Sequence, residues 1–235
     1  MKILGVESSA TAASVAVYSD GKIISQLFSN TGLTHSQTLL PMVDGALNIA
    51  KLKLSDVDYI AVSNGPGSFT GVRIGVSAVK GMAQPLGIKC IEVSTLEAIA
   101  KPLANTGCYA VSVMDARCNQ VYTAQFNCEN GFCRVTKDEA ITIDELAEQL
   151  KNINKNIVLI GDGTSVAFNK LKDVINNISV CEKSVQYQTA QNVCLIAAEM
   201  LEDGFEGNNA NDILPHYLRL SQAERELKNK KLKGD

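Results

Sequence analysis

Histidine, basic charge and long apolar runs are all scarce in this sequence of 235 residues. Its two histidines, His35 and His216, lie far apart, so a metal site built from clustered imidazoles is not indicated. The net charge is −3, whereas a protein that binds nucleic acid unaided usually carries a basic excess. No apolar stretch reaches the roughly 20 residues of a membrane span, and Glu7 interrupts the start before a signal peptide could form. We therefore expect a cytoplasmic protein that binds RNA poorly on its own.

Paired cysteines are also lacking. The seven cysteines are odd in number, none forms a C-x-x-C pair, and most lie in apolar runs such as Gly87-Ile88-Lys89-Cys90-Ile91. This pattern favours reduced cysteines in the core over a disulfide framework, a redox centre or a ligand set.

The first half of the chain predicts strands and helices in alternation. With 46% hydrophobic and 20% charged residues, the chain can bury a core. Strands are predicted at 2–6, 13–18 and 23–28, with Asp20-Gly21 as a hairpin turn. Apolar residues at helical spacing predict helices at 36–51 and 70–86, strands at 59–62 and 88–93, and a helix at 95–103.

The same pattern restarts near Asn105-Thr106-Gly107. We predict strands at 109–114, 120–126 and 157–160, helices at 143–150 and 190–201, and a further helix opened by the turn Gly161-Asp162-Gly163. Mixed strands with crossover helices are typical of α/β layers. We therefore predict an α/β protein with a first lobe at 1–105 and a smaller second lobe at 106–235, whose tail at 206–235 packs back on the first lobe.

Two loops carry residues suited to holding a nucleotide or another anion. Glu7-Ser8-Ser9 follows the first strand, where N–H groups and hydroxyls could surround a phosphate while Glu7 points into a cleft. In the second loop, Gly65 and Gly67 permit unusual backbone angles, and Ser68 or Thr70 can cap the next helix and leave free N–H groups. Polar turns and tight strand-to-helix junctions need the same residues without any ligand, so both interpretations stay open.

Four segments together resemble the bacterial TsaB (YeaZ) family, over nearly the whole chain. They are Asn64-Gly65-Pro66-Gly67-Ser68-Phe69-Thr70-Gly71-Val72-Arg73-Ile74-Gly75, His35-Ser36-x-x-Leu39-Leu40-Pro41, Asp115-Ala116-Arg117-x-x-x-Val121-Tyr122 and Pro215-His216-Tyr217-Leu218-Arg219. One departure is Glu7-Ser8-Ser9, where the family usually has Asp-Thr-Ser, but the carboxylate is kept. The resemblance implies two actin-like (ASKHA, ribonuclease H-like) lobes with mixed sheets flanked by helices.

The resemblance also implies a function in tRNA modification. The chain would be the dimerisation and scaffold subunit of the complex that forms threonylcarbamoyladenosine in tRNAs reading codons that begin with adenine. It would bind and activate the catalytic subunit TsaD, with the ATPase TsaE as a further partner, and would form a homodimer when alone.

The same resemblance implies that this chain is not the enzyme. The related catalytic subunit holds a metal with a His-x-x-x-His pair, and Thr95 and Ile99 stand at the corresponding positions here. Neither side chain can replace an imidazole. We expect no catalytic residue, no metal and no required cofactor in this chain, although ATP or ADP could bind in the complex.

Both long predicted helices of the first lobe carry apolar residues on two sides, so each needs two neighbours. One side suits the sheet, and the other could pack against the equivalent helix pair of a related subunit as a four-helix bundle. Burial of both sides within this chain is the alternative. We predict a partner interface formed by His35, Leu39, Met42, Gly45, Ala46, Ile49, Arg73, Ile74, Ala78, Gly81 and Met82.

Two other functions stay open from the residues alone. A stand-alone actin-like ATPase or phosphotransferase would act through the loops at Glu7 and Gly65. An RNA-binding module would use the basic tail and add electrostatic help to a complex already on tRNA. Arg117 is expected to pair with Asp115 and fix a turn. The charged tail residues are Arg225, Lys228, Lys230, Lys231 and Lys233.

Overall fold

The structure, a computed structural model, describes residues 1–219. A first sheet has the order β3-β2-β1-β4-β5. β1 pairs antiparallel with β2, and β2 with β3, whereas β4 lies parallel to both β1 and β5. The strands are β1 (Lys2–Glu7), β2 (Ala13–Ser19), β3 (Lys22–Ser29), β4 (Tyr59–Gly65) and β5 (Lys89–Ser94).

A second sheet repeats this order. It runs β11-β10-β6-β7-β8, with β9 also paired to β7, and it has the same antiparallel and parallel neighbours. Two such sheets in one chain are the actin-like, ribonuclease H-like arrangement, so the predicted fold is confirmed. The strands are β6 (Tyr109–Asp115), β7 (Gln120–Asn127), β8 (Cys133–Arg134), β9 (Glu139–Thr142), β10 (Ile157–Ile160) and β11 (Ile178–Val180).

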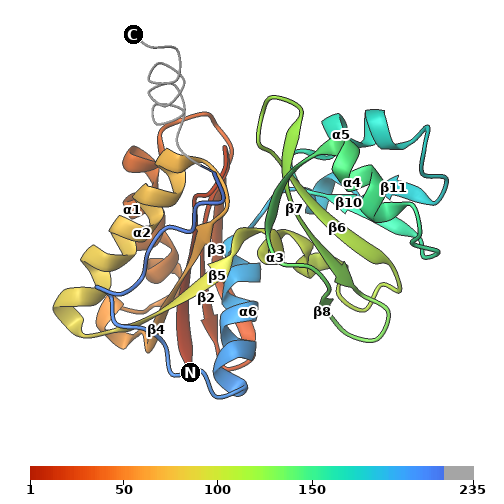
Figure 1. Cartoon of the computed structure of the whole chain (residues 1–235). Coiled ribbons are helices and arrows are strands. Elements are labelled where there is room, and N and C mark those ends of the chain that lie inside the picture. Colours follow the sequence, from red (N-terminus) through yellow and green to blue (C-terminus); the bar gives the residue numbers. More distant parts are fainter. Residues whose placement is uncertain (220–235) are drawn as a thin grey trace, which may run out of the picture.

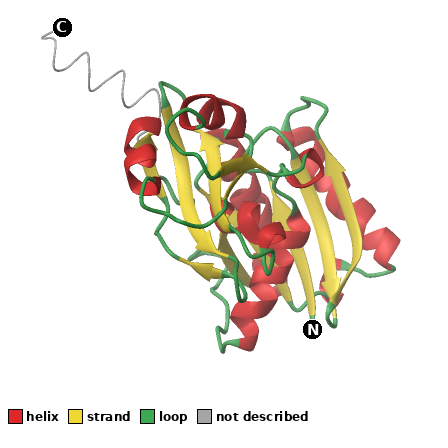
Figure 2. Cartoon of the chain, turned by 90° about the vertical axis from the view of Figure 1, so that its right-hand side faces the viewer, coloured by secondary structure: helices red, strands yellow, loops and turns green. Residues whose placement is uncertain are grey.

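Each sheet is covered by helices, as Figures 1 and 2 show. α1 (His35–Ala50) and α2 (Phe69–Ala83) cover one face of the first sheet, and α4 (Ile143–Leu150) and α5 (Thr164–Leu171) occupy the corresponding place in the second lobe. The prediction that one side of each helix faces the sheet is confirmed, since the apolar residues of that side form one buried cluster with the sheet. Its helical members include Leu39, Val43, Val72, Val76 and Val79.

The third helix of each lobe packs on the other lobe. α3 (Thr95–Ala100) lies between the lobes: it contacts β4 and β5 of the first as well as β6 and β7 of the second, and it buries Leu96 and Ile99 in a cluster of second-lobe residues. α6 (Ala190–Glu202), blue in Figure 1, contacts β1 and β2 and buries Val193 and Ala197 against the first sheet. The expected boundary at residue 105 assigns α6 to the second lobe, whereas its contacts are with the first. Neither lobe is therefore completed by its own segment of chain alone.

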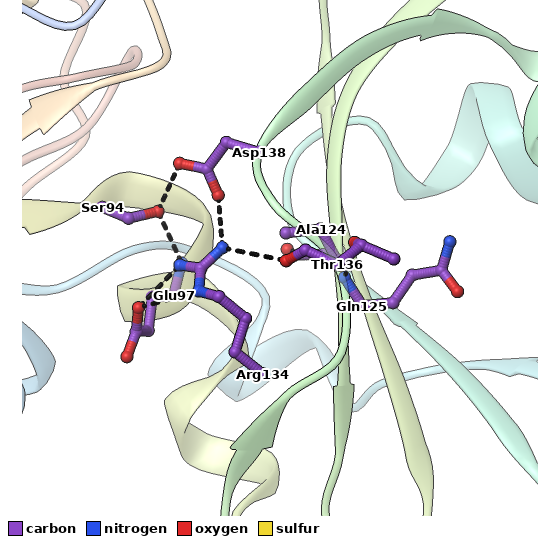
Figure 3. Close-up of polar contacts among 8 residues, drawn as sticks. Ser94, Glu97, Ala124, Gln125, Arg134, Thr136 and Asp138 are labelled. Carbon is purple, nitrogen blue, oxygen red and sulfur yellow. Dashed lines mark hydrogen bonds and ion pairs between the residues drawn. The ribbon is translucent and has the colours of Figure 1, made fainter.

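A polar network fastens α3 to the second lobe (Figure 3). The guanidinium of Arg134, in β8, donates to Glu97 of α3 at 2.6 Å and to Asp138 at 2.6 Å. Ser94, at the start of α3, donates to the other oxygen of Asp138 at 2.7 Å. Because these groups are partly buried, the contacts are less screened than ion pairs at the surface.

After α6 the chain returns along the first lobe. Cys90 and Asn208 exchange backbone hydrogen bonds at 2.8 Å, and the N–H of His216 donates to the carbonyl of Asn64 at 2.7 Å. The predicted basic tail, from Arg225 to Lys233, lies outside the described residues. Within residues 1–219, no helix combines the length and apolar character needed to cross a membrane.

All seven cysteines are free thiols. Cys90, Cys108, Cys128 and Cys194 are buried, as predicted. Cys118 and Cys133 are exposed, so the prediction of a core position is wrong for these two.

Candidate functional site

The turn after β1 encloses its own carboxylate. Oε1 of Glu7 accepts hydrogen bonds from the N–H of Ser9 at 2.6 Å and from its hydroxyl at 2.5 Å. Burial raises the pKa of Glu7 above its usual value, and the interactions of its carboxylate with the Ser63 hydroxyl and with Ser9 only partly oppose this. The expectation that Glu7 points into a cleft is wrong, because its side chain is fully buried.

The glycine-rich loop packs tightly against this turn. A Cβ at Gly67 would lie 2.3 Å from the carbonyl oxygen of Ser9, and one at Gly71 would lie 2.1 Å from that of Ser8. The N–H of Ser68 donates to the carbonyl of Ser9 at 2.7 Å, and the Ser68 side chain caps α2 by accepting from the N–H of Gly71. Close backbone packing within the chain thus accounts for these glycines, and it leaves Ser8 and Ser9 buried.

The equivalent turn of the second lobe is open. Oδ1 of Asp115 accepts from the backbone N–H of Arg117 at 2.7 Å, which repeats the bond from Glu7 to the residue two positions on. The expected contact between Asp115 and Arg117 is therefore made by the backbone, not by the guanidinium. Arg117, Cys118 and Asn119 all have left-handed backbone angles, with φ of 63°, 54° and 60°.

A second G-x-G junction completes the parallel between the lobes. Gly65 ends β4 and Gly161 follows β10, with φ of 126° and 119°. A Cβ at Gly163 would lie 2.8 Å from the backbone N of Asp115, as one at Gly67 would meet Ser9. Asp162 lies between Gly161 and Gly163, and burial raises its pKa. A hydrogen bond from the backbone N–H of Asp115 opposes this rise, and the charge of the Asp115 carboxylate adds to it.

A cleft of about 650 Å³ lies between the lobes. Its first-lobe wall holds hydroxyls, including those of Thr11, Ser68 and Thr70. Its second-lobe wall holds Asp115 and Asp162, with the cations Arg117 and Arg219 beside them. Of the six predicted anion-loop residues, Glu7, Ser8 and Ser9 are buried and Gly65 is covered by His216, whereas Gly67 and Ser68 reach the surface of the cleft.

No metal centre is formed by the described part of the chain. Across residues 1–219, no group of three or more His, Cys, Asp or Glu side chains is placed to hold an ion. Thr95 and Ile99 are both buried inside the protein. His35 begins α1, and its Nε2 lies 2.7 Å from the carbonyl oxygen of Ala10.

The outer side of α1 and α2 presents apolar surface beside small residues. Ile49 of α1 is 64% exposed, and a Cβ at Gly81 of α2 would meet nothing within 4 Å. Ile74, Ala78 and Met82 are half-buried at the edge of the core. Leu40, which the interface prediction omitted, is 51% exposed, but it lies nine positions before Ile49 and therefore on the opposite flank of α1. We call the following set of residues the docking face: Ile49, Arg73, Ile74, Ala78, Gly81 and Met82.

Four residues of the predicted interface face the interior of this chain and do not belong to the docking face. Leu39, Met42 and Ala46 are buried against the chain's own sheet, so they cannot contact a partner. A Cβ at Gly45 would meet the Leu27 side chain of β3 at 3.2 Å, so this glycine accommodates an internal neighbour. The sequence could not separate these residues from Ile49, because helical spacing shows that two faces are apolar but not how wide each one is.

An aromatic and cationic cluster lies where α2 begins. Phe69 and Tyr217 stack with ring centroids 4.5 Å apart, and the Arg73 guanidinium lies 5.4 Å from the centroid of the Tyr217 ring. Nε of Arg73 donates to the hydroxyl of Tyr217 at 2.7 Å. The sequence analysis identified residues 215–219 as a motif, but nothing in the sequence indicated that this segment contacts α2.

Comparisons with known proteins agree with this architecture. The family model for TsaD, tRNA N6-adenosine threonylcarbamoyltransferase, matches residues 29–227. The tRNA threonylcarbamoyladenosine biosynthesis protein TsaB of Escherichia coli (strain K12) is 30% identical over 98% of this chain and 100% of that protein. TsaB of Bacillus subtilis (strain 168) is 28% identical over 95% and 96%.

Two further comparisons extend the relationship. The tRNA N6-adenosine threonylcarbamoyltransferase of Prosthecochloris aestuarii is 31% identical over 42% of this chain and 32% of that protein. Among solved structures, YeaZ from Pseudomonas aeruginosa superposes with a TM-score of 0.77 at 25% identity, covering 92% of this chain and 99% of that one.

Proposed function

Because the chain belongs to the TsaB (YeaZ) family of tRNA threonylcarbamoyladenosine biosynthesis proteins, we propose that it is the scaffold subunit of a threonylcarbamoyl transferase complex. It binds and activates a catalytic TsaD-type subunit, and the complex modifies tRNAs that read codons beginning with adenine. The observation on which this proposal rests is the docking face: Ile49 of α1 is exposed, and no other part of the chain packs against Gly81 of α2.

The similarity of this chain to the TsaD family supports the proposal that the two subunits meet through α1 and α2. Since this chain matches the TsaD family model, a TsaD-type partner carries a helix pair equivalent to α1 and α2. Equivalent faces of related subunits can pack around a pseudo-two-fold axis, as identical faces do in a homodimer. Small residues such as Ala78 and Gly81 allow two helices to approach closely. A four-helix bundle follows, and the same face forms a homodimer when the partner is absent.

The buried first-lobe loop supports a non-catalytic role. An actin-like ATPase binds phosphates at such loops. Here the N–H of Ser9 already donates a hydrogen bond to the Glu7 carboxylate, and α2 packs over Ser8. The alternative of a stand-alone ATPase is therefore not favoured. No cofactor is required by this chain, and ATP or ADP binds in the complex. We place the complex in the cytoplasm, with a TsaE-type ATPase as its third component.

The experiment is to place a long cation on the docking face. Gly81→Arg fits within the chain because the site is open, but it blocks close approach of another helix. We expect the variant to lose co-elution with the TsaD-type subunit in size-exclusion chromatography and to restore little modified nucleoside in a depleted extract. The matched control is Val166→Arg on α5, where the side chain is 44% exposed in the second lobe. Normal binding by Gly81→Arg would contradict the proposal.

A further inference from the structure

The motif at residues 215–219 crosses from one lobe to the other. On the first lobe, His216 donates to the carbonyl of Asn64, and Tyr217 stacks on Phe69. On the second lobe, Leu218 packs against the apolar cluster that includes Met114, and Arg219 donates to the carbonyl of Ala116. We call residues 215–219 the strap.

The strap also fixes a residue of the docking face. Arg73 is exposed on α2, and a free arginine side chain samples many rotamers. Here its Nε donates to the Tyr217 hydroxyl, and its guanidinium lies within 6 Å of the Tyr217 and Phe69 ring centroids, 5.4 and 5.7 Å away. The remaining guanidinium N–H groups stay available to an acceptor on a bound subunit.

We propose that the strap is a positioning element for partner binding: Tyr217 holds Arg73 ready on the docking face, and the second lobe holds the strap through Leu218 and Arg219. The second lobe then strengthens binding of the TsaD-type subunit without touching it. This inference rests on the proposed docking of that subunit on α1 and α2.

Pre-organisation explains why such a contact would matter. A side chain that is already ordered loses less conformational entropy when a complex forms, so the complex is tighter. Removing only the Tyr217 hydroxyl leaves the ring on Phe69 and frees the Arg73 side chain. We expect Tyr217→Phe to weaken binding of the TsaD-type subunit about tenfold, near the upper end of the cost of ordering one long side chain at an interface.

A double-mutant cycle tests the inference. Affinities for the TsaD-type subunit are measured by calorimetry for the full chain, Tyr217→Phe, Arg73→Ala and the double variant. If Tyr217 acts through Arg73, Tyr217→Phe has no further effect once Arg73 is alanine. An equal loss with and without Arg73 would overturn the inference. Arg73→Ala binding as tightly as the unaltered chain would overturn it too.

A second pair of variants tests the connection to the second lobe. Arg219→Ala releases the strap from Ala116, and we expect about threefold weaker binding although the residue lies in the inter-lobe cleft. The matched control is Lys170→Ala, which removes a contact to Asn119 in the same hairpin turn without touching the strap. Equal affinities of Arg219→Ala and Lys170→Ala would overturn the role of the second lobe.

The cycle also separates this inference from the proposed function. If Gly81→Arg abolishes binding while the cycle shows no coupling, the docking face stands and the strap inference fails. If Gly81→Arg binds normally, the docking face itself is wrong, and the strap inference falls with it.

Discussion

The two lobes share a strand order and turn chemistry, yet they use their helices differently. In the first lobe α1 and α2 have 16 and 15 residues, and α2 covers the turn at Glu7. In the second lobe α4 and α5 have 8 residues each, and the turn at Asp115 stays exposed to the cleft. One architectural plan has therefore produced one lobe with surplus apolar helix surface and another with an open polar loop.

This difference shows that the sheet does not determine where a ligand or partner binds. Glu7 and Asp115 end equivalent strands and accept the same type of hydrogen bond, but only Glu7 is removed from solvent. The helix that follows the G-x-G junction decides the outcome. Gly71 and Gly75 let α2 approach Ser8, whereas the corresponding stretch of α5 contains Ala167 and Leu171.

The largest expected effect tests whether the lobes are separable at all. Leu96→Ala empties a fully buried position of α3 inside the second-lobe cluster and should lower the free energy of unfolding by about 2–5 kcal/mol. Because α3 and α6 are exchanged between lobes, urea should still unfold both lobes in one transition. Fluorescence from a probe placed in each lobe provides the measurement. Two separate transitions would show that the lobes are independent.

A smaller effect is expected from breaking the packing that distinguishes the first lobe. Gly71→Ala places a methyl group 2.1 Å from the Ser8 carbonyl oxygen, so the backbone must shift. We expect a loss of about 1–3 kcal/mol in the free energy of unfolding. Gly81→Ala on the same helix is the control, since its site is open and alanine favours the helix. Equal denaturation midpoints would refute close packing at this turn.

The smallest effect concerns the buried carboxylate and depends on pH. The pKa of Glu7 is raised in the folded state, so the stability it contributes is present below its unfolded pKa and is lost as pH rises through the folded pKa. Glu7→Gln keeps an oxygen that accepts from Ser9 and has no charge to bury. Its stability relative to the unaltered chain should therefore increase as the pH is raised from about 5, just above the ordinary pKa of a glutamate, to about 8.

Urea midpoints at the two pH values test this prediction. Asp115→Asn is the matched variant in the second lobe, because water reaches that carboxylate. A constant difference between Glu7→Gln and the unaltered chain at both pH values would contradict the assignment of a buried charge.

The sequence predicted the repeat of the fold but not all of its elements. The strands of seven and eight residues, such as β2 and β7, were found, and β10 was placed at its observed limits. β8 and β11 were missed because they have 2 and 3 residues, too few to show a period. β9 has 4 residues, as β10 does, but its sequence Glu-Ala-Ile-Thr lacks the continuous apolar run Ile-Val-Leu-Ile of β10. The helix predicted at 70–86 leaves α-helical geometry after Ala83, since Pro85 lacks an N–H donor.

The site was less predictable, because its key contacts join residues far apart in the chain. Spacing identified Ile49 and Gly81, but burial of Met42 depends on the exact orientation of α1 over the sheet. Nothing in the local pattern of Tyr217 indicates that it meets Arg73, 144 positions earlier. Such pairings follow from the path of the returning chain, which no single segment encodes.

The exchange of α3 and α6 also has a consequence for synthesis on the ribosome. The first sheet emerges early, but the helix that covers one of its faces ends at Glu202. Until that helix appears, side chains such as Ile3 and Ile91 lie on a bare apolar surface that chaperones can bind and other nascent chains can join. Truncated products that stop before Ala190 should therefore aggregate, because the apolar face of the first sheet is covered only after α6 has been synthesised.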